Sequence, residues 1–369
     1  MTIGLIGLGA MGLGIAQVFA QSGHPVRATD SNADSRSSAR DRMDSILAAR
    51  VAKGTLSDGE KTAILDRLTV VDRAEDIAPA DLVIEAVVER LAVKQAVFSL
   101  LEPYLAPSAV LATNTSSLSV AAIAQGLTRP QRVIGLHFFN PAPVMRLVEL
   151  VPHAGTDADA LTTARRLTEA AGKTVIQCAD RPGFIVNRCA RPFYGEALAL
   201  LEEGRSAAEI DAAMVAAGYR LGPFGLIDLV GADINLAATE SLAGAMGNHP
   251  RYHVFDALKT QVAKGHIGRK SLKGFIFPDD PAAPPRDADA IALRIEATLV
   301  NEAAWLLSEG GTTADGIDTA LKLGLNFPRG PFETLARHGR DAIRQTLENL
   351  AQNAPAHLQG RYLPAPALA

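Results

Sequence analysis

Two ionisable side chains lie in the apolar segment LHFFNPAPVMRLVEL, residues 136–150. His137 is near the end of one apolar run, and Glu149 lies inside the next, after a turn at Asn140-Pro141. A return strand beside the first would bring the imidazole and the carboxylate within reach of each other. Histidine titrates near neutral pH and a carboxylate can orient its ring, so the pair could act as a general base and its partner. A satisfied buried histidine and a partly exposed carboxylate are the alternative.

A second chemical signal is the segment IGLIGLGAMGLGIAQVF, residues 3–19, which reads as strand, glycine turn and helix. In the pattern GxGxxG, the first glycine permits a tight turn and the second lets the backbone approach a pyrophosphate. The third allows close helix-to-strand packing, and N–H groups at the helix start hold the phosphates. A glycine-rich turn of another α/β domain is the alternative. We predict dinucleotide binding at Gly7, Gly9, Ala10, Met11 and Gly12.

The choice between NAD and NADP is predicted from Asp30, which closes the next apolar run. An acidic side chain at this place accepts hydrogen bonds from the adenosine ribose hydroxyls and repels a 2′-phosphate, which favours NAD. A nicotinamide nearby also gives His137 a task, because oxidising an alcohol by hydride transfer requires a base for the hydroxyl proton.

Polar residues follow two further predicted strands. Glu89 and Lys94 lie where the run DLVIEAVV passes into a helix, and Asn114, Ser116 and Ser117 follow the run AVLAT. The carboxyl ends of parallel strands meet at one edge of a sheet, where such folds bind ligands. A solvated corner would equally explain the first two residues, and a helix cap at Ser117 would explain one serine. We expect at least one of Asn114, Ser116 and Ser117 to face a ligand.

Composition narrows the class of protein. The chain has 369 residues, 48% hydrophobic and 21% charged, so it can form two or three domains. A net charge of −4 and a pI near 6.1 provide no basic field for nucleic acid or anionic lipid. No apolar run approaches a membrane span, and the first strand begins too early for a targeting segment, so we expect a cytoplasmic protein. Two cysteines fit packed thiols and provide no metal site.

The C-terminal half is predicted to be helical and internally repeated. It opens with RPGFIVNRCARPFYGEALALLEEG, residues 181–204, in which Asn187 lies one turn into the helix. A site between this region and the first domain is expected to take the substrate. Three residues recur with an offset of 106 and one tripeptide with an offset of 108, namely Arg188/Arg294, Glu196/Glu302, Gly204/Gly310 and Gly222-Pro-Phe224/Gly330-Pro-Phe332. The counterpart of Asn187 is Leu293, so the second copy should be scaffold.

The predicted fold class is therefore α/β, with a Rossmann-type NAD-binding domain followed by two tandem all-α helical domains. We expect the first domain at residues 1–179 and the first helical domain at 180–278. The acidic, proline-rich segment 279–289 reads as an exposed linker, and the second helical copy would occupy 290–369.

At this point the chain resembles the L-3-hydroxyacyl-CoA dehydrogenases of fatty-acid and aromatic degradation. The motifs in register are GLGAMGLGIA, DLVIEAVVERLAVK, TNTSSL, GLHFFNPAPVMRLVELV and RPGFIVNR. The resemblance implies NAD-dependent oxidation of a (3S)-3-hydroxyacyl-CoA, as in β-oxidation, to the 3-ketoacyl-CoA. Acyl-CoA is the implied partner.

The resemblance also implies roles for individual residues. His137 would be the general base and Glu149 its partner, while Ser116 and Asn187 would hydrogen-bond the reacting oxygen region. Asp30, Glu89, Lys94 and Asn114 would contact the cofactor. Asn140 is expected on the substrate side, and Lys53, in a helical hairpin at residues 47–56, would touch the CoA nucleotide, although an ordinary solvated lysine is the alternative there.

Within the family, VERLAVK, HFFNPAPVM, NRCARPFYGEA and the second helical copy are most similar to 3-hydroxyadipyl-CoA dehydrogenases of phenylacetate breakdown, then to 3-hydroxybutyryl-CoA dehydrogenases. The short linker and the segment GRKSLKGFIF differ from the usual pattern, so the acyl chain stays open. Two other functions stay open as well: a dehydrogenase of a free hydroxy acid or sugar acid, and a non-catalytic NAD-binding structural protein. The chain retains all four catalytic candidates, which argues against a non-catalytic protein; they are His137, Glu149, Ser116 and Asn187.

A monomer is the favoured assembly, with a homodimer as the alternative. The resemblance implies that family members with one helical copy form dimers, in which the helical domains of the two subunits pack on each other. Here segments 291–307 and 317–325 retain apolar positions at helical spacing, so the second copy can replace a partner subunit in cis.

Overall fold

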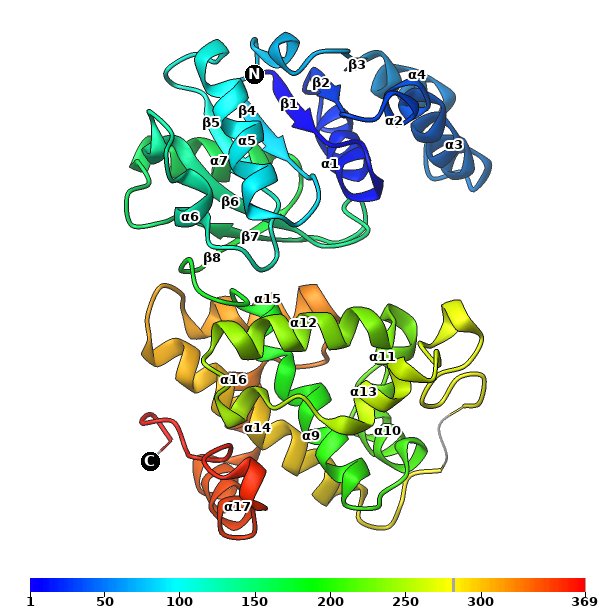
Figure 1. Ribbon diagram of the computed structural model, residues 1–369. Coiled ribbons are helices and arrows are strands. Elements are labelled where there is room, and N and C mark those ends of the chain that lie inside the picture. The colour runs from blue at the N-terminus through cyan, green and yellow to red at the C-terminus, as the bar shows by residue number, and fades with distance from the viewer. Residues whose placement is uncertain (281–282, 369) are drawn as a thin grey trace. The chain divides into compact units, whose positions relative to one another are not determined.

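The computed structural model describes residues 1–280 and 283–368. The chain forms two compact units, one from Met1 to Arg181 and the other from Pro182 onward (Figure 1). Each unit has its own core and is described by itself.

The first unit is built on one eight-stranded sheet with the order β3-β2-β1-β4-β5-β6-β7-β8 (Figure 1). All neighbouring strands are parallel except β6 and β7. The strands are β1 (Ile3–Ile6), β2 (Val26–Thr29), β3 (Leu68–Val70), β4 (Leu82–Glu85), β5 (Val110–Thr113), β6 (Val133–Phe138), β7 (Leu147–Val151) and β8 (Thr174–Gln177). The order 3-2-1-4-5-6 is that of the doubly wound dinucleotide-binding folds, which confirms the predicted α/β class.

The helices that connect these strands begin at local sequence signals. Ser57 forms a capping box with Glu60, and Asn32 accepts hydrogen bonds from two N–H groups of the helix that follows it. The helices of this unit are α1 (Ala10–Gln21), α2 (Ala33–Ser37), α3 (Ala39–Ala52), α4 (Asp58–Asp66), α5 (Leu91–Leu101), α6 (Val120–Ala124) and α7 (Ala158–Ala170). The parallel order brings the carboxyl ends of β1, β4, β5 and β6 to one edge of the sheet.

The second unit is helical, as predicted. The helices up to residue 280 are α8 (Val186–Cys189), α9 (Arg191–Glu202), α10 (Ala207–Ala216), α11 (Pro223–Val230), α12 (Ala232–Ala245) and α13 (Asp256–Ala263). Those after residue 283 are α14 (Ala288–Ser308), α15 (Ala314–Leu325), α16 (Pro331–His338) and α17 (Arg340–Gln352). Helix α14 begins inside the predicted linker, of which residues 281–282 lie outside the described residues.

The two helical copies pack on each other and exchange equivalent ion pairs. Arg188 of the first copy donates to Glu302 of the second at 2.7 Å, and Arg294 of the second donates to Glu196 of the first at 2.7 Å. Asp211 accepts N–H bonds at the start of α11, and Asp318 does so at the start of α16. The repeat in the sequence is therefore a repeat in structure, and each copy supplies the other with counter-charges.

Two smaller predictions concern the cysteines and the membrane. Cys178 and Cys189 are buried, as predicted for packed thiols. Among the described residues, we find no helix that is long and apolar enough to cross a bilayer.

Candidate active site

His137 and Glu149 face each other across two neighbouring strands. The antiparallel pairing of β6 with β7 sets the two residues opposite each other in register. His137 Nδ1 lies 2.7 Å from Glu149 Oε2, and the carboxylate is fully buried. The predicted return strand is thus present, and the alternative of a partly exposed carboxylate is wrong.

The pairing decides which nitrogen of the neutral imidazole carries the proton. Because a carboxylate can only accept a hydrogen bond, the neutral ring carries its proton on Nδ1 and donates it to Glu149. The lone pair then lies on Nε2, which is the nitrogen able to take up a proton. Once it does, the buried carboxylate offsets the positive charge of the ring. The ring also lies 4.5 Å from that of Phe139, between centroids, which restricts its orientation.

The glycine turn after β1 fits a dinucleotide. Gly7 has φ +99°, a conformation that side chains disfavour, and a Cβ on Gly12 would lie 1.8 Å from the carbonyl oxygen of Gly7. A Cβ on Gly9 would instead meet nothing within 4 Å, so there is room for a phosphate close to the backbone. No side chain caps α1, which leaves its first N–H groups suited to an anion. Ala10 and Met11 are the first two residues of that helix.

Asp30 lies directly after β2 and is tied to the glycine turn. Its Oδ2 accepts the N–H of Leu8 at 2.7 Å, and its Oδ1 accepts the N–H of Asn32 at 2.8 Å. These bonds hold the carboxylate beside the turn, and each oxygen keeps a second lone pair for a ribose hydroxyl.

Glu89 and Lys94 meet in a charge cluster at the same sheet edge, in which Lys94 is buried and Glu89 is partly exposed. The Lys94 ammonium has no exposed surface and lies 2.9 Å from Glu85 and 3.2 Å from Glu89. The Thr113 hydroxyl also donates to Glu85. The sequence prediction missed Glu85 and Thr113, although each is the last residue of a buried strand, which was the available signal. The cluster joins the ends of β4 and β5 to α5.

The loop after β5 is organised by Glu89. Its Oε1 accepts the Thr115 hydroxyl at 2.6 Å and the N–H groups of Ser116 and Ser117 at 3.0 and 3.2 Å. Burial raises the pKa of Glu89, but the Thr115 hydroxyl and the Lys94 charge outweigh it, so the pKa is lowered. The alternative of a helix cap at Ser117 is wrong, because Ser119 caps α6 and the Ser117 hydroxyl donates to Glu89 instead.

Asn114 ties this loop to the strand that carries His137. Its Oδ1 accepts the N–H of Phe138, the residue after the histidine, at 2.8 Å. Ser116 is half-buried two positions further along the loop. Asn114 therefore fixes the end of β5 against the end of β6, and the two strand ends can move only together.

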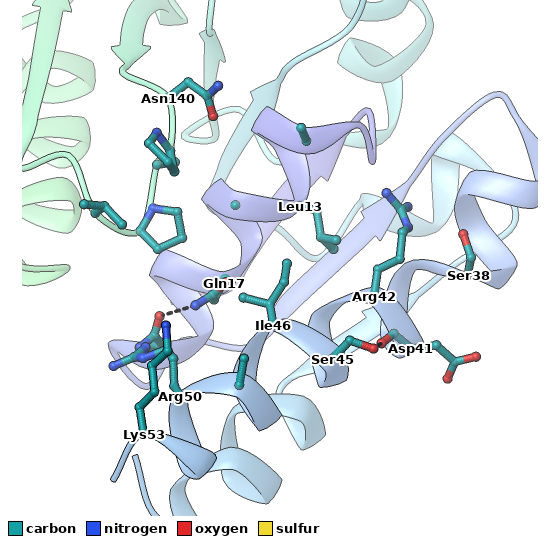
Figure 2. Close-up of a pocket in the computed structure, with 18 residues that line it drawn as sticks. Leu13, Gln17, Ser38, Asp41, Arg42, Ser45, Ile46, Arg50, Lys53 and Asn140 are labelled. Carbon is teal, nitrogen blue, oxygen red and sulfur yellow. Dashed lines mark hydrogen bonds between the residues drawn. The ribbon is translucent and has the colours of Figure 1, made fainter. Parts of the chain in front are cut away.

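A large cavity lies beside α1 in the first unit (Figure 2). Its volume is about 1100 Å³, and its wall includes the apolar Leu13 and Ile46 and the cations Arg42, Arg50 and Lys53. Asn140 and the loop that follows it close the opposite side. The structure thus brings the predicted substrate residues Lys53 and Asn140 to one cavity, whose wall does not include His137 or Glu149. The sequence prediction missed the two arginines, which follow no strand end.

Lys173 holds the loop on that side of the cavity. Its buried ammonium donates to the carbonyl oxygens of Ala142 at 2.6 Å and Met145 at 2.8 Å. Burial lowers its pKa to about 8. Asn187, the remaining predicted site residue, lies in the second unit, at the second position of α8.

The two units match two models of one family. The model described as "3-hydroxyacyl-CoA dehydrogenase, NAD binding domain" matches residues 2–181. The model described as "3-hydroxyacyl-CoA dehydrogenase, C-terminal domain" matches residues 183–277 and 291–368. The second match falls on both helical copies, and the first confirms NAD as the cofactor.

Individual relatives agree with these matches. The 3-hydroxyadipyl-CoA dehydrogenase of Escherichia coli K12 is 34% identical, over 95% of this chain and 93% of that enzyme. The probable 3-hydroxybutyryl-CoA dehydrogenase of Bacillus subtilis 168 is 37% identical, over 73% of this chain and 94% of that protein. The crystal structure of the 3-hydroxybutyryl-CoA dehydrogenase of E. coli K12 matches with a TM-score of 0.92 and 34% identity, over 100% of this chain and 97% of that one. The predicted resemblance is confirmed, and the chain belongs to the NAD-dependent 3-hydroxyacyl-CoA dehydrogenase family.

Proposed function

We propose that this chain oxidises a (3S)-3-hydroxyacyl-CoA to the 3-ketoacyl-CoA with His137 as the general base. The observation that carries this proposal is the buried contact of 2.7 Å between His137 Nδ1 and Glu149 Oε2. It leaves the Nε2 lone pair to take the hydroxyl proton, while Glu149 stabilises the imidazolium that forms. Bound NAD supplies the acceptor for the hydride.

Three further residues are proposed to position the substrate. Ser116 and Asn187 hydrogen-bond the reacting oxygen, so that its proton faces the imidazole. Asn140 contributes to the substrate side from the wall of the cavity. Hydrogen bonds that hold the hydroxyl in one orientation lower the entropic cost of reaching the transition state.

Cofactor binding is assigned to the sheet edge of the first unit. The glycine turn from Gly7 to Gly12 holds the pyrophosphate, and Asp30 accepts the ribose hydroxyls. Glu89, Lys94 and Asn114 set the two loops against which the nicotinamide half lies. The buried ion pairs of Lys94 support this role, because they fix the ends of β4 and β5 together.

The CoA part is assigned to the cavity in Figure 2. Its apolar floor suits the pantetheine arm, and Arg42, Arg50 and Lys53 supply positive charge for phosphates at its wall (Figure 2). By the names of the relatives, the acyl group is 3-hydroxyadipyl or 3-hydroxybutyryl. Both substrate and cofactor are dissolved metabolites, and the cytoplasm is the proposed compartment.

The test is an assay of NADH formation over acyl-CoA substrates of varied chain length, with and without a terminal carboxylate. Free 3-hydroxy acids and sugar acids serve as controls. We expect turnover of the CoA esters alone. Turnover of free acids without activity on any CoA ester would contradict the proposal and favour a dehydrogenase of free hydroxy acids.

A further inference from the structure

Arg191 is a buried cation whose partners are all neutral. The residue is 8% exposed, at the first position of α9. Its Nε donates to the Asn187 carbonyl at 3.1 Å, and its Nη1 donates to Thr239 Oγ1 at 3.0 Å and to the Asn235 carbonyl at 3.4 Å. The ring of Tyr194 lies 4.9 Å away. No carboxylate of the described residues forms an ion pair with it.

Other buried arginines of this unit are paired. Arg188, 1% exposed at its side chain, is bound by Glu302 and Glu309, and Arg361, 3% exposed, is bound by Glu196. A buried charge without a counter-charge destabilises the fold, so proteins rarely keep one for packing alone. Arg191 therefore lacks the anion that the same helical bundle supplies elsewhere.

The second helical copy shows what the fold requires at these positions. With the offset of 106 that relates Arg188 to Arg294, the counterpart of Arg191 is Ala297. With the offset of 108 that relates Gly222 to Gly330, the counterparts of Asn235 and Thr239 are Ile343 and Leu347. These three apolar residues are fully buried in one hydrophobic cluster, against which Leu293 packs. The packing of α9 on α12 thus does not need a polar cluster.

Asn235 supplies a second unpaired group at the same place. Asn235 is 4% exposed, and its Oδ1 is buried without a hydrogen-bond partner among the described residues. Among the residues described, none bonds to its amide nitrogen either. The N–H groups of this amide can donate to a carboxylate, whereas its Oδ1 only accepts and needs another partner.

We propose that Arg191, with the Asn235 amide, binds the terminal carboxylate of a dicarboxylic 3-hydroxyacyl-CoA. This inference rests on the proposed function and names its substrate class. Arg191 follows Asn187 by one helical turn, roughly 6 Å. With Asn187 at the reacting oxygen, Arg191 is placed to meet the far end of a short acyl chain. Nε and Nη1 of Arg191 are engaged, whereas Nη2 bonds to none of the described residues, so its N–H groups can donate to a carboxylate oxygen.

The test compares two substrates of equal length, 3-hydroxyadipyl-CoA and 3-hydroxyhexanoyl-CoA. We expect the wild-type chain to prefer the diacid in kcat/KM by roughly 10²-fold or more, because a site built for a polar group rejects the analogue that lacks it. Arg191→Met should remove most of this preference and leave kcat/KM for the hexanoyl ester within a few-fold. If Arg191 were purely structural, its replacement would lower kcat/KM for both esters together.

A second variant guards against misfolding. Arg191→Ala combined with Asn235→Ile and Thr239→Leu copies the apolar residues of the second repeat, so it should fold and should also lose the preference. Equal kcat/KM for the two esters in the wild-type chain would overturn the inference and leave the proposed function intact. Absence of turnover with both esters, while a shorter 3-hydroxyacyl-CoA is oxidised, would also overturn the inference, whereas absence of turnover with every CoA ester would overturn the proposed function. A variant that folds and keeps the preference would remove Arg191 from substrate recognition.

Discussion

At the scale of single residues, the reactivity of His137 depends on which of its nitrogens carries the proton. Glu149 lies in the strand interior without exposed surface, so water cannot replace it as the acceptor for Nδ1–H. A glutamine at position 149 could orient the ring but could not offset the charge of the imidazolium. The carboxylate is therefore expected to act on rate more than on substrate binding.

We predict that His137→Gln lowers kcat by roughly 10²- to 10⁴-fold while NAD binding persists, since a positioned base contributes about that factor. Glu149→Gln should also lower kcat. Steady-state rates with a saturating acyl-CoA, together with NAD affinity by fluorescence, check both variants. An unchanged kcat for His137→Gln would exclude it as the base, and a loss of thermal stability alone would make Glu149 structural.

A second prediction at this scale concerns Asp30 and the choice of cofactor. Its carboxylate is held beside the glycine turn by the Leu8 and Asn32 N–H groups, so it cannot move away from a 2′-phosphate. The wild-type chain should reduce NAD with a much higher kcat/KM than NADP, and Asp30→Ala should narrow the ratio. Equal efficiency with both cofactors in the wild-type chain would show that Asp30 does not select between them.

At the scale of elements, the loop from Asn140 to Met145 is fixed by one lysine that lies directly before β8. Lys173 has a pKa of about 8 in the fold, whereas an exposed lysine titrates near 10.4. Between these values the unfolded chain binds more protons than the folded one, so this residue makes the free energy of unfolding rise with pH.

The corresponding prediction is that the destabilisation caused by Lys173→Met grows between pH 7.5 and pH 9.5. The wild-type chain gains stability from deprotonation of the lysine over this interval, and the variant does not. Urea unfolding of both proteins at the two pH values measures the difference. A destabilisation that stays constant or shrinks with rising pH would contradict the lowered pKa.

At the scale of the whole molecule, the second helical copy has kept its packing and lost its polar site. Arg294 and Glu302 exchange ion pairs with the first copy, whereas Leu293 and Ala297 stand where that copy has Asn187 and Arg191. The contact that could join two subunits is therefore made within one chain. We propose that the protein is a monomer, with domains at 1–179, 180–278 and 290–369 and the linker 279–289.

Light scattering should accordingly give a mass near 38.8 kDa for the intact chain. Deleting the residues after about Asp280 should expose the apolar and charged face of the first copy and cause a new dimer or aggregation. A dimer of the intact chain, with the helical copies packed between subunits, would overturn this assignment.

The sequence by itself determined the cofactor fold and the pairing of His137 with Glu149. Gly7, Gly9 and Gly12 act through backbone geometry that their spacing already specifies, and buried parallel strands show as apolar runs. The turn at Asn140-Pro141 between two such runs was enough to predict that Glu149 returns beside His137.

Tertiary packing alone decided the remaining features. Glu85 has a role only because α5 delivers Lys94 to it, and Ser119 caps α6 while the Ser117 hydroxyl donates to Glu89. The unpaired charge of Arg191 could not be read from the chain either, since its meaning depends on which groups fail to surround it. Such properties arise from contacts between residues far apart in sequence. Local periodicity and spacing carry no information about these contacts.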